Sequence, residues 1–178
     1  MKNLLYVLLF LPVLISCKKS VVDELPPATQ TGANTFGANV NGKLWVPTSS
    51  AIGTAKLEAR YAVNDLIINA RNLASTPTES EFELYIKDLN GPGIYPLNQN
   101  TSPFPNQTAS YGYYISRKFT PINEWITSSL FTGTVNITLD DSVNHIVSGT
   151  FQFDALNMYS SPDTLHVTDG RFDVKISF

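Results

Sequence analysis

Apolar and polar residues alternate with a period of two from Phe36 onward, which is the pattern of half-buried β-strands. The first such stretch, "FGANVNGKLW", contains Asn41-Gly42, the strongest short-range signal for a two-residue hairpin turn. A turn of this kind pairs Val40 with Lys43 and places Trp45 on the same face as Phe36. The pattern therefore predicts an antiparallel hairpin at the start of the folded domain.

The same alternation recurs along the rest of the chain and is interrupted by turn residues. Within 81–88, the apolar side chains of Phe82, Leu84 and Ile86 share one face, and Glu81 and Glu83 share the other. A retaining glycosidase needs two carboxyl groups ~5–5.5 Å apart on either side of a cleft. Glu81 and Glu83 are expected ~7 Å apart on the face opposite the apolar side chains, which favours a solvated surface. The predicted strands span residues 56–63, 66–71, 81–88, 108–116, 132–139, 146–155, 164–168 and 171–178, with a short edge-like piece at 90–96.

These roughly nine or ten strands, mostly linked by hairpins and without a helical stripe, predict an all-β fold. The architecture is an antiparallel β-sandwich or an open up-and-down barrel. We expect Asp169-Gly170 to form a tight turn between the last two strands and the final strand to lie inside a sheet. Residues 121–128 are expected to hold one short helical turn.

The first sixteen residues have a different character. Leu4 to Ile15 is apolar apart from Tyr6 and Pro12, and Lys2 precedes it. The run has the length of the apolar region of a signal peptide and is shorter than the ~20 residues of a membrane-spanning helix. We therefore predict that residues 1–16 are a signal peptide.

The end of this run holds the only cysteine of the chain. The residues Leu14-Ile15-Ser16-Cys17 resemble the lipobox of bacterial lipoproteins. The resemblance implies cleavage between Ser16 and Cys17 and acylation of Cys17, so that the chain is anchored in a lipid bilayer without spanning it. Lys18 takes the place of the aspartate that marks inner-membrane retention in enteric bacteria, which favours the outer membrane. The sequence leaves open whether the domain faces the periplasm or the exterior.

Residues 17–35 are polar, aperiodic and contain Pro26-Pro27, and we interpret them as the lipidated N-terminus and a flexible tether. Fully extended, the tether reaches about 60 Å at ~3.3–3.6 Å per residue. The β domain then covers residues 36–178.

Composition narrows the possible functions. The net charge of -3 disfavours a nucleic-acid partner, which requires a basic face. The two histidines, His145 and His166, lack the spacing of a zinc site, and no phosphate-binding glycine loop is present. A calcium site at "LDDSVN" is possible from its oxygens, but a simple turn is favoured. We therefore predict no cofactor, no metal and no catalytic residue.

The most suggestive stretch for ligand binding is "YGYYISRKFTPINEW", where aromatic residues stand beside charged ones. Such clusters stack on sugar rings in lectin-like sites and form hot spots in protein interfaces. Along a strand two of these tyrosines share one face and the third points to the other, so half of the cluster is expected in the core. The candidate ligand-binding residues are Tyr111, Tyr113, Tyr114 and Trp125.

Two short motifs, Asp141-Ser142-Val143 and Asp163-Thr164-Leu165, resemble the sequon at which some bacteria O-glycosylate exported proteins. Both lie in or beside predicted loops. The resemblance makes Ser142 and Thr164 candidate O-glycosylation sites.

Two longer segments, "LPPATQTGANTFGANVNGKLWVP" and "VSGTFQFDALN…VTDGRFDVKISF", resemble a family of small uncharacterised outer-membrane lipoproteins of Bacteroidetes-type bacteria. The resemblance implies a β domain on a lipoprotein and brings no activity with it. We expect a non-catalytic binding or accessory protein of the cell envelope with a glycan or a protein as its ligand. A structural or assembly protein and a polysaccharide hydrolase are the alternatives.

Overall fold

The computed structural model describes residues 24–48, 55–74, 79–117, 122–160 and 162–177. These residues form eleven β-strands and no helix. The strands are β1 (Thr35–Val40), β2 (Lys43–Trp45), β3 (Leu57–Ala62), β4 (Asp65–Asn72), β5 (Glu79–Ile86), β6 (Gly93–Leu97), β7 (Tyr111–Arg117), β8 (Ile122–Ile126), β9 (Gly133–Asp141), β10 (Ile146–Asn157) and β11 (Thr164–Lys175).

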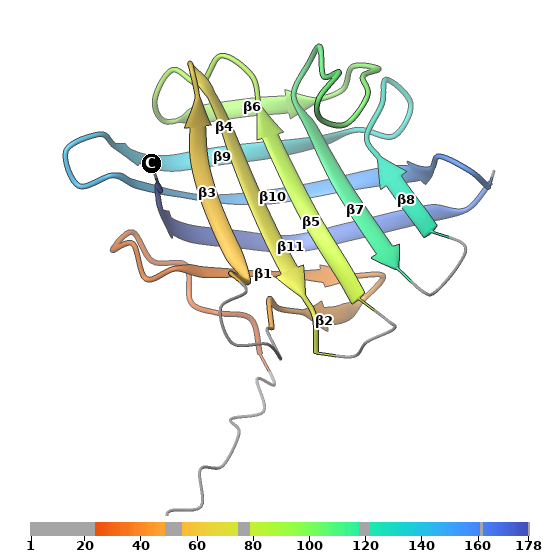
Figure 1. Cartoon of the computed structure of the whole chain (residues 1–178), viewed down its shortest axis with the longest axis horizontal. Helices are drawn as coiled ribbons and strands as arrows, with labels where there is room; N and C mark the ends of the chain where they lie inside the picture. Colours follow the sequence, from red (N-terminus) through yellow and green to blue (C-terminus); the bar gives the residue numbers. More distant parts are fainter. Residues whose placement is uncertain (1–23, 49–54, 75–78, 118–121, 161, 178) are drawn as a thin grey trace, which may run out of the picture.

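The strands build one sheet that curls over on itself. Its order is β2-β1-β11-β10-β8-β7-β5-β4-β3, with β9 also pairing with β10, and β6 with β9. All of these strand pairs are antiparallel. Figure 1 shows β3, β4, β5 and β7 crossing steeply over β9, β10, β11 and β1. The prediction of an all-β, antiparallel fold is confirmed, and the last strand lies inside the sheet between β1 and β10.

The two layers are joined at both sides. On one side Leu156 and Asn157 of β10 pair with Ile126 and Trp125 of β8. On the other side the backbone N–H of Ser177 donates to the carbonyl oxygen of Ala59 in β3 at 2.8 Å. The curl therefore encloses a single core between its layers.

The core consists of the inward half of each alternating strand. The predicted hairpin is confirmed, because Val40 pairs with Lys43 and Ala38 with Trp45. Trp45 meets Phe36 edge to face, with ring centroids 5.9 Å apart. Burial of each such side chain contributes on the order of 1.5–3 kcal/mol to folding.

Two expectations for local structure are wrong. Residues 122–126 form strand β8 and no helical turn, because they pair with β7 on one side and β10 on the other. The dipeptide Asp169-Gly170 forms a β-bulge inside the continuous strand β11, where the pairing with both β1 and β10 shifts register. Asp169 has a φ of 55°, a left-handed conformation that aspartate tolerates better than most residues.

The expected tether also differs in its described part. Residues 24–34, which we call the N-terminal strap, lie against the sheet. Asp173 of β11 accepts hydrogen bonds from the Thr29 hydroxyl (2.6 Å) and from the backbone N–H groups of Thr31 (3.0 Å) and Gly32 (2.8 Å). A carboxylate that is 1% exposed needs such donors, and the strap supplies them. The segment expected to hang free is thus bound to the domain from Pro26 onward, since Arg171 also donates to the Pro26 carbonyl oxygen at 3.5 Å.

No helix in the described part of the chain is long and apolar enough to cross a membrane. The predicted signal peptide and the predicted lipidation site at Ser16-Cys17 lie outside the described residues.

Candidate functional site

The four aromatic candidates are divided between two faces of the sheet. Tyr114 and Trp125 point into the core, where their ring centroids lie 5.8 Å apart and each is more than nine-tenths buried. Tyr111 and Tyr113 point to the outer face of the layer formed by β3, β4, β5 and β7, which we call the front layer (Figure 1). The expectation that one part of the cluster belongs to the core is therefore confirmed, and the four residues do not form one platform.

Tyr111 is also inaccessible, although it lies on the outer face. Its ring stacks on Tyr85, and the backbone N–H of Phe104, in the segment between β6 and β7, donates to its hydroxyl at 2.9 Å. The Tyr111 hydroxyl donates in turn to Glu83. Burial and this hydrogen bond raise the pKa of Tyr111 far above its ordinary value, so that it remains a donor at every physiological pH. Tyr111 positions Glu83 and offers no surface to a ligand.

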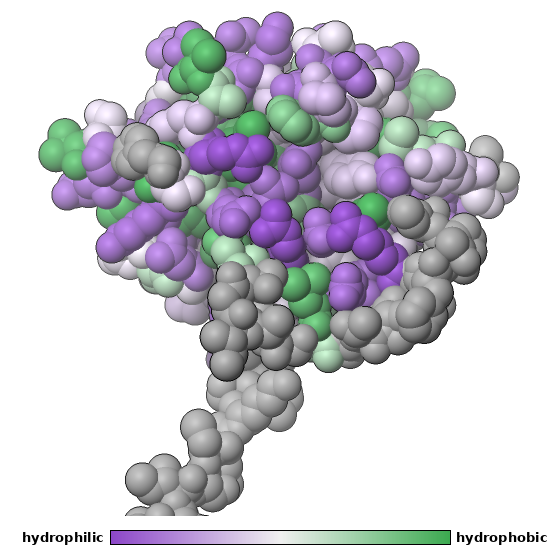
Figure 2. Space-filling model, viewed as in Figure 1, coloured by the Kyte–Doolittle hydropathy of each residue, from purple (hydrophilic) through white to green (hydrophobic). Residues whose placement is uncertain are grey.

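Of the four candidates, Tyr113 lines a hollow formed by described residues, which we call the acidic groove. The groove has a volume of about 290 Å³ and is walled by β4, β5, β7, β8 and the Pro103-Phe104 segment. Strand pairing places Tyr113 directly opposite Glu83, and Ile115 between Glu81 and Glu124. Figure 2 shows hydrophilic side chains gathered over the strands of this front layer.

The polar groups of the acidic groove hold one another in place. Arg117 and Arg71 both form ion pairs with Glu81, the latter at 3.8 Å. With its amide nitrogen turned toward Glu83, Asn69 donates to that carboxylate at 2.9 Å. This network makes the groove rigid before any ligand arrives.

Glu124 is held by tyrosine hydroxyls. Tyr159 donates to it at 3.3 Å, and a hydrogen bond to Glu124, added to burial, raises the pKa of Tyr113 far above the ordinary value. Among the described residues, neither Glu83 nor Glu124 forms an ion pair. The groove lining carries three carboxylates and one guanidinium, and Arg71 adds a second guanidinium paired with Glu81, so the net charge of the groove remains negative.

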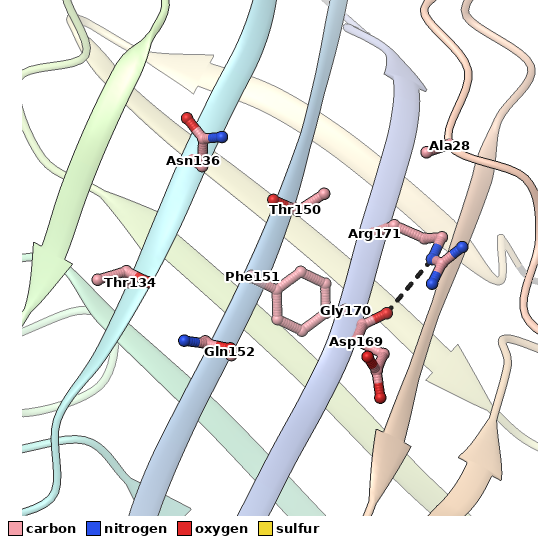
Figure 3. Close-up of a pocket in the computed structure, with 9 residues that line it drawn as sticks. All are labelled: Ala28, Thr134, Asn136, Thr150, Phe151, Gln152, Asp169, Gly170 and Arg171. Carbon is pink, nitrogen blue, oxygen red and sulfur yellow. Dashed lines mark hydrogen bonds between the residues drawn. The ribbon is translucent and has the colours of Figure 1, made fainter.

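A second hollow lies on the opposite side of the molecule, over β9, β10 and β11 (Figure 3). It has a volume of about 480 Å³, and Ala28 of the strap forms its edge. Its side chains are mostly uncharged and polar, and we call it the polar trough. Sequence reasoning missed it, because the alternation predicts that these residues face outward but does not tell which strands lie side by side. The lining residues used below are Thr134, Asn136, Thr150, Gln152, Asp169 and Arg171.

The two candidate O-glycosylation sites lie at different degrees of exposure. Ser142 is exposed at the tip of the β9–β10 hairpin, and Thr164 is half-buried at the start of β11. The Asp141 carboxylate accepts hydrogen bonds from Val143 and Asn144, so it closes the turn at Ser142. The described residues contain no group of three or more side chains suited to a metal ion. His166 forms a surface pair with Asp154, with Nδ1 2.7 Å from Oδ1.

Comparison with known proteins places the chain in a family. A comparison with curated proteins finds no significant match, and neither does a comparison with solved structures. The family model of DUF6252, a domain of unknown function, matches residues 33–174, which span the sheet from just before β1 to the end of β11. The chain therefore belongs to the DUF6252 family.

Proposed function

We propose that this protein is an outer-membrane lipoprotein, anchored through acylated Cys17, whose β domain binds a positively charged segment of another envelope protein in the acidic groove. The proposal has two parts, an anchor and a binding site. They rest on different observations and can be tested separately.

The anchor is supported by the sequence. A short apolar run ends at Ser16-Cys17, the cysteine has no second cysteine to pair with, and polar chain follows it. One acyl chain binds a membrane weakly at about 0.8 kcal/mol per buried CH₂, whereas two or three hold a protein there persistently. The lipobox pattern and Lys18 support the outer membrane as the location.

The observation that carries the binding proposal is the placement of Tyr113 between two carboxylates, Glu83 and Glu124. Neither forms an ion pair with another described residue. The charged group of a lysine or arginine side chain can form ion pairs with the two carboxylates and lie over the face of the Tyr113 ring in a cation–π contact. Phe104, which is 55% exposed at the rim, adds apolar area for the stem of such a side chain. The net negative charge of the groove favours this ligand over a neutral sugar.

The hydrolase alternative has one observation in its favour, since Glu81, Glu83 and Glu124 line the same groove. A glycosidase acid needs a carboxyl held protonated, usually in an apolar pocket. These carboxylates instead lie among polar groups and accept hydrogen bonds from arginine, asparagine or tyrosine donors. The arrangement suits binding better than proton donation.

The two sequon matches are a further part of the proposal. Ser142 is the better acceptor of the two, because its hydroxyl stands exposed on a hairpin turn and Thr164 is half-buried within a paired strand.

The binding proposal is tested with a fluorescent peptide of alternating lysine and serine, using anisotropy at low salt. We expect Tyr113→Ala and Glu124→Gln each to weaken binding at least fivefold and 300 mM salt to weaken it further. Glu24→Gln, which removes the same charge from the exposed start of the strap, is the matched control. Equal binding by all variants, or none by the native protein, contradicts the proposal.

A further inference from the structure

The polar trough is longer than a single hollow. A neighbouring depression of about 330 Å³ shares Thr134 and Gln152 with it and continues along β10 to Asp154. The floor from Thr150 to Asp154 is about 13 Å long at ~3.3 Å per residue. Such a shape accepts an extended ligand lying along the strand.

Four neutral side chains line the middle of the trough, Thr134 and Asn136 from β9 and Thr150 and Gln152 from β10. Figure 3 shows them on two adjacent strands around one hollow. Within the described part of the chain, none of them is hydrogen-bonded through its side chain to another protein group. Hydroxyl and amide groups each donate and accept, so together they match a ligand that does both.

The end of the trough near the strap is rigid. At the β-bulge, the Asp169 carboxylate accepts hydrogen bonds from Asn39 (2.9 Å) and Thr168 (3.0 Å). These bonds lower the pKa of Asp169, so that the carboxylate is charged and available as an acceptor. Arg171 donates through Nε to the Asp169 carbonyl oxygen at 3.3 Å and through a terminal nitrogen to the carbonyl oxygen of Pro26 in the strap at 3.5 Å.

The charges that line the polar trough indicate whether its ligand is charged or neutral. One carboxylate and one guanidinium line the 480 Å³ hollow, so its formal charge is zero, and the neighbouring depression adds the Asp154 carboxylate, which pairs with His166. A site without net charge attracts neither cationic nor anionic ligands from solution. Its hydroxyl and amide groups also make poor contacts with an apolar lipid chain. A neutral polyhydroxylated chain can replace the water on each of these groups.

We propose that the polar trough is a second binding site, independent of the acidic groove, and that it binds a neutral stretch of polysaccharide along β10. The inference goes beyond the proposed protein-binding function. With one site on each outer face of the curled sheet, the protein can hold a glycan and a basic protein segment at once.

The test uses neutral hexasaccharides of glucose, mannose, xylose and N-acetylglucosamine as probes, with backbone amide chemical shifts as the readout. We expect at least one probe to shift residues of β9, β10 and β11 at millimolar concentration. The double variant Asn136→Ala/Gln152→Ala should weaken that binding at least tenfold. The control Asn98→Ala/Gln99→Ala removes the same two side-chain types from an exposed loop and should leave it unchanged.

The two sites are told apart by Tyr113→Ala, which should weaken lysine-peptide binding at least fivefold and leave saccharide binding intact. Failure of every hexasaccharide to shift the trough, or equal binding by the trough variant, overturns this inference and leaves the groove proposal standing. The inference is also overturned if Tyr113→Ala loses saccharide binding and the trough variant keeps it, because the glycan would then lie in the acidic groove.

Discussion

Among the described residues, the Asp173 side chain accepts more hydrogen bonds than any other carboxylate. Besides the strap donors, the Ser148 hydroxyl donates to it at 2.8 Å from β10. One carboxylate thereby joins β11, β10 and the segment that leads toward the predicted anchor. Its role is structural, and it is the residue at which folding and tethering depend on each other.

Asp173→Asn is expected to destabilise the domain by about 3 kcal/mol, because a buried amide nitrogen would face donors that have lost their acceptor. Urea unfolding measures the difference. Asp88→Asn, on an exposed turn that also has a positive φ, is the control and should change stability by less than about 0.5 kcal/mol. Equal stability of the two variants would contradict the account.

The same residue predicts a dependence of stability on pH. Burial alone would raise the pKa of Asp173, but the hydrogen bonds led by Thr29 outweigh it and hold the pKa well below its ordinary value. A depressed pKa stabilises the fold above the unfolded pKa of about 3.9 and loses this contribution as the pH falls through the folded pKa.

The stability gap between native protein and Asp173→Asn should therefore be constant from pH 7 to about pH 5 and shrink below about pH 4. Unfolding curves collected at several pH values measure it. A gap that grows on acidification would show that the sign is wrong.

At the scale of elements, β11 shows what periodicity can and cannot predict. Alternation identifies both halves of the strand, and the Asn41-Gly42 hairpin follows from local turn chemistry alone. The Asp169-Gly170 bulge does not, because the same dipeptide closes a hairpin or fits a bulge according to whether partners continue on both sides. Strand β8 was missed for a related reason, since five residues are too short to show a clear alternation and the strand is defined by its pairing with β7 and β10.

The candidate sites were predictable to a similar extent. Period two assigned Glu81 and Glu83 to a solvated face and placed Tyr113 on the face opposite to Tyr114, and the structure brings Glu81, Glu83 and Tyr113 together in one groove. The burial of Tyr111 depends on the packing of Phe104 over it, which periodicity does not contain. The polar trough requires the register between β9 and β10, which a single sequence does not supply.

The bulge glycine gives an element-scale prediction. A Cβ on Gly170 would lie 2.5 Å from the Phe151 carbonyl oxygen and 2.6 Å from its ring. We expect Gly170→Ala to cost about 2 kcal/mol, because backbone and core must both shift. Thermal unfolding measures it, with Gly93→Ala as control, where the nearest atom is 3.9 Å away. A Gly170→Ala protein as stable as the control would mean that the bulge is looser than described.

At the scale of the whole molecule, the bound strap shortens the proposed tether. Lys18 to Leu25 separate Cys17 from Pro26, the first strap residue hydrogen-bonded to the sheet, so the reach is at most about 32 Å at ~3.5 Å per residue, in place of about 60 Å. The domain is thus expected to stay close to the bilayer surface.

Energy transfer from a dye at Val143→Cys, 84% exposed in the β9–β10 turn, to acceptors on the vesicle surface measures this closeness in acylated protein. Asp173→Asn should release the strap and reduce the transfer. Transfer that is the same in both proteins would show that the strap does not limit the reach.

The proposed presentation of either binding face at a membrane requires the predicted acyl chains at Cys17. Mass spectrometry of the protein isolated from its native cells tests this most directly. We predict an amino-terminal peptide that begins at Cys17, with diacylglycerol on the sulfur and an acyl group on the amine. A chain that retains Met1, or one that begins at an unmodified residue, would contradict the anchor.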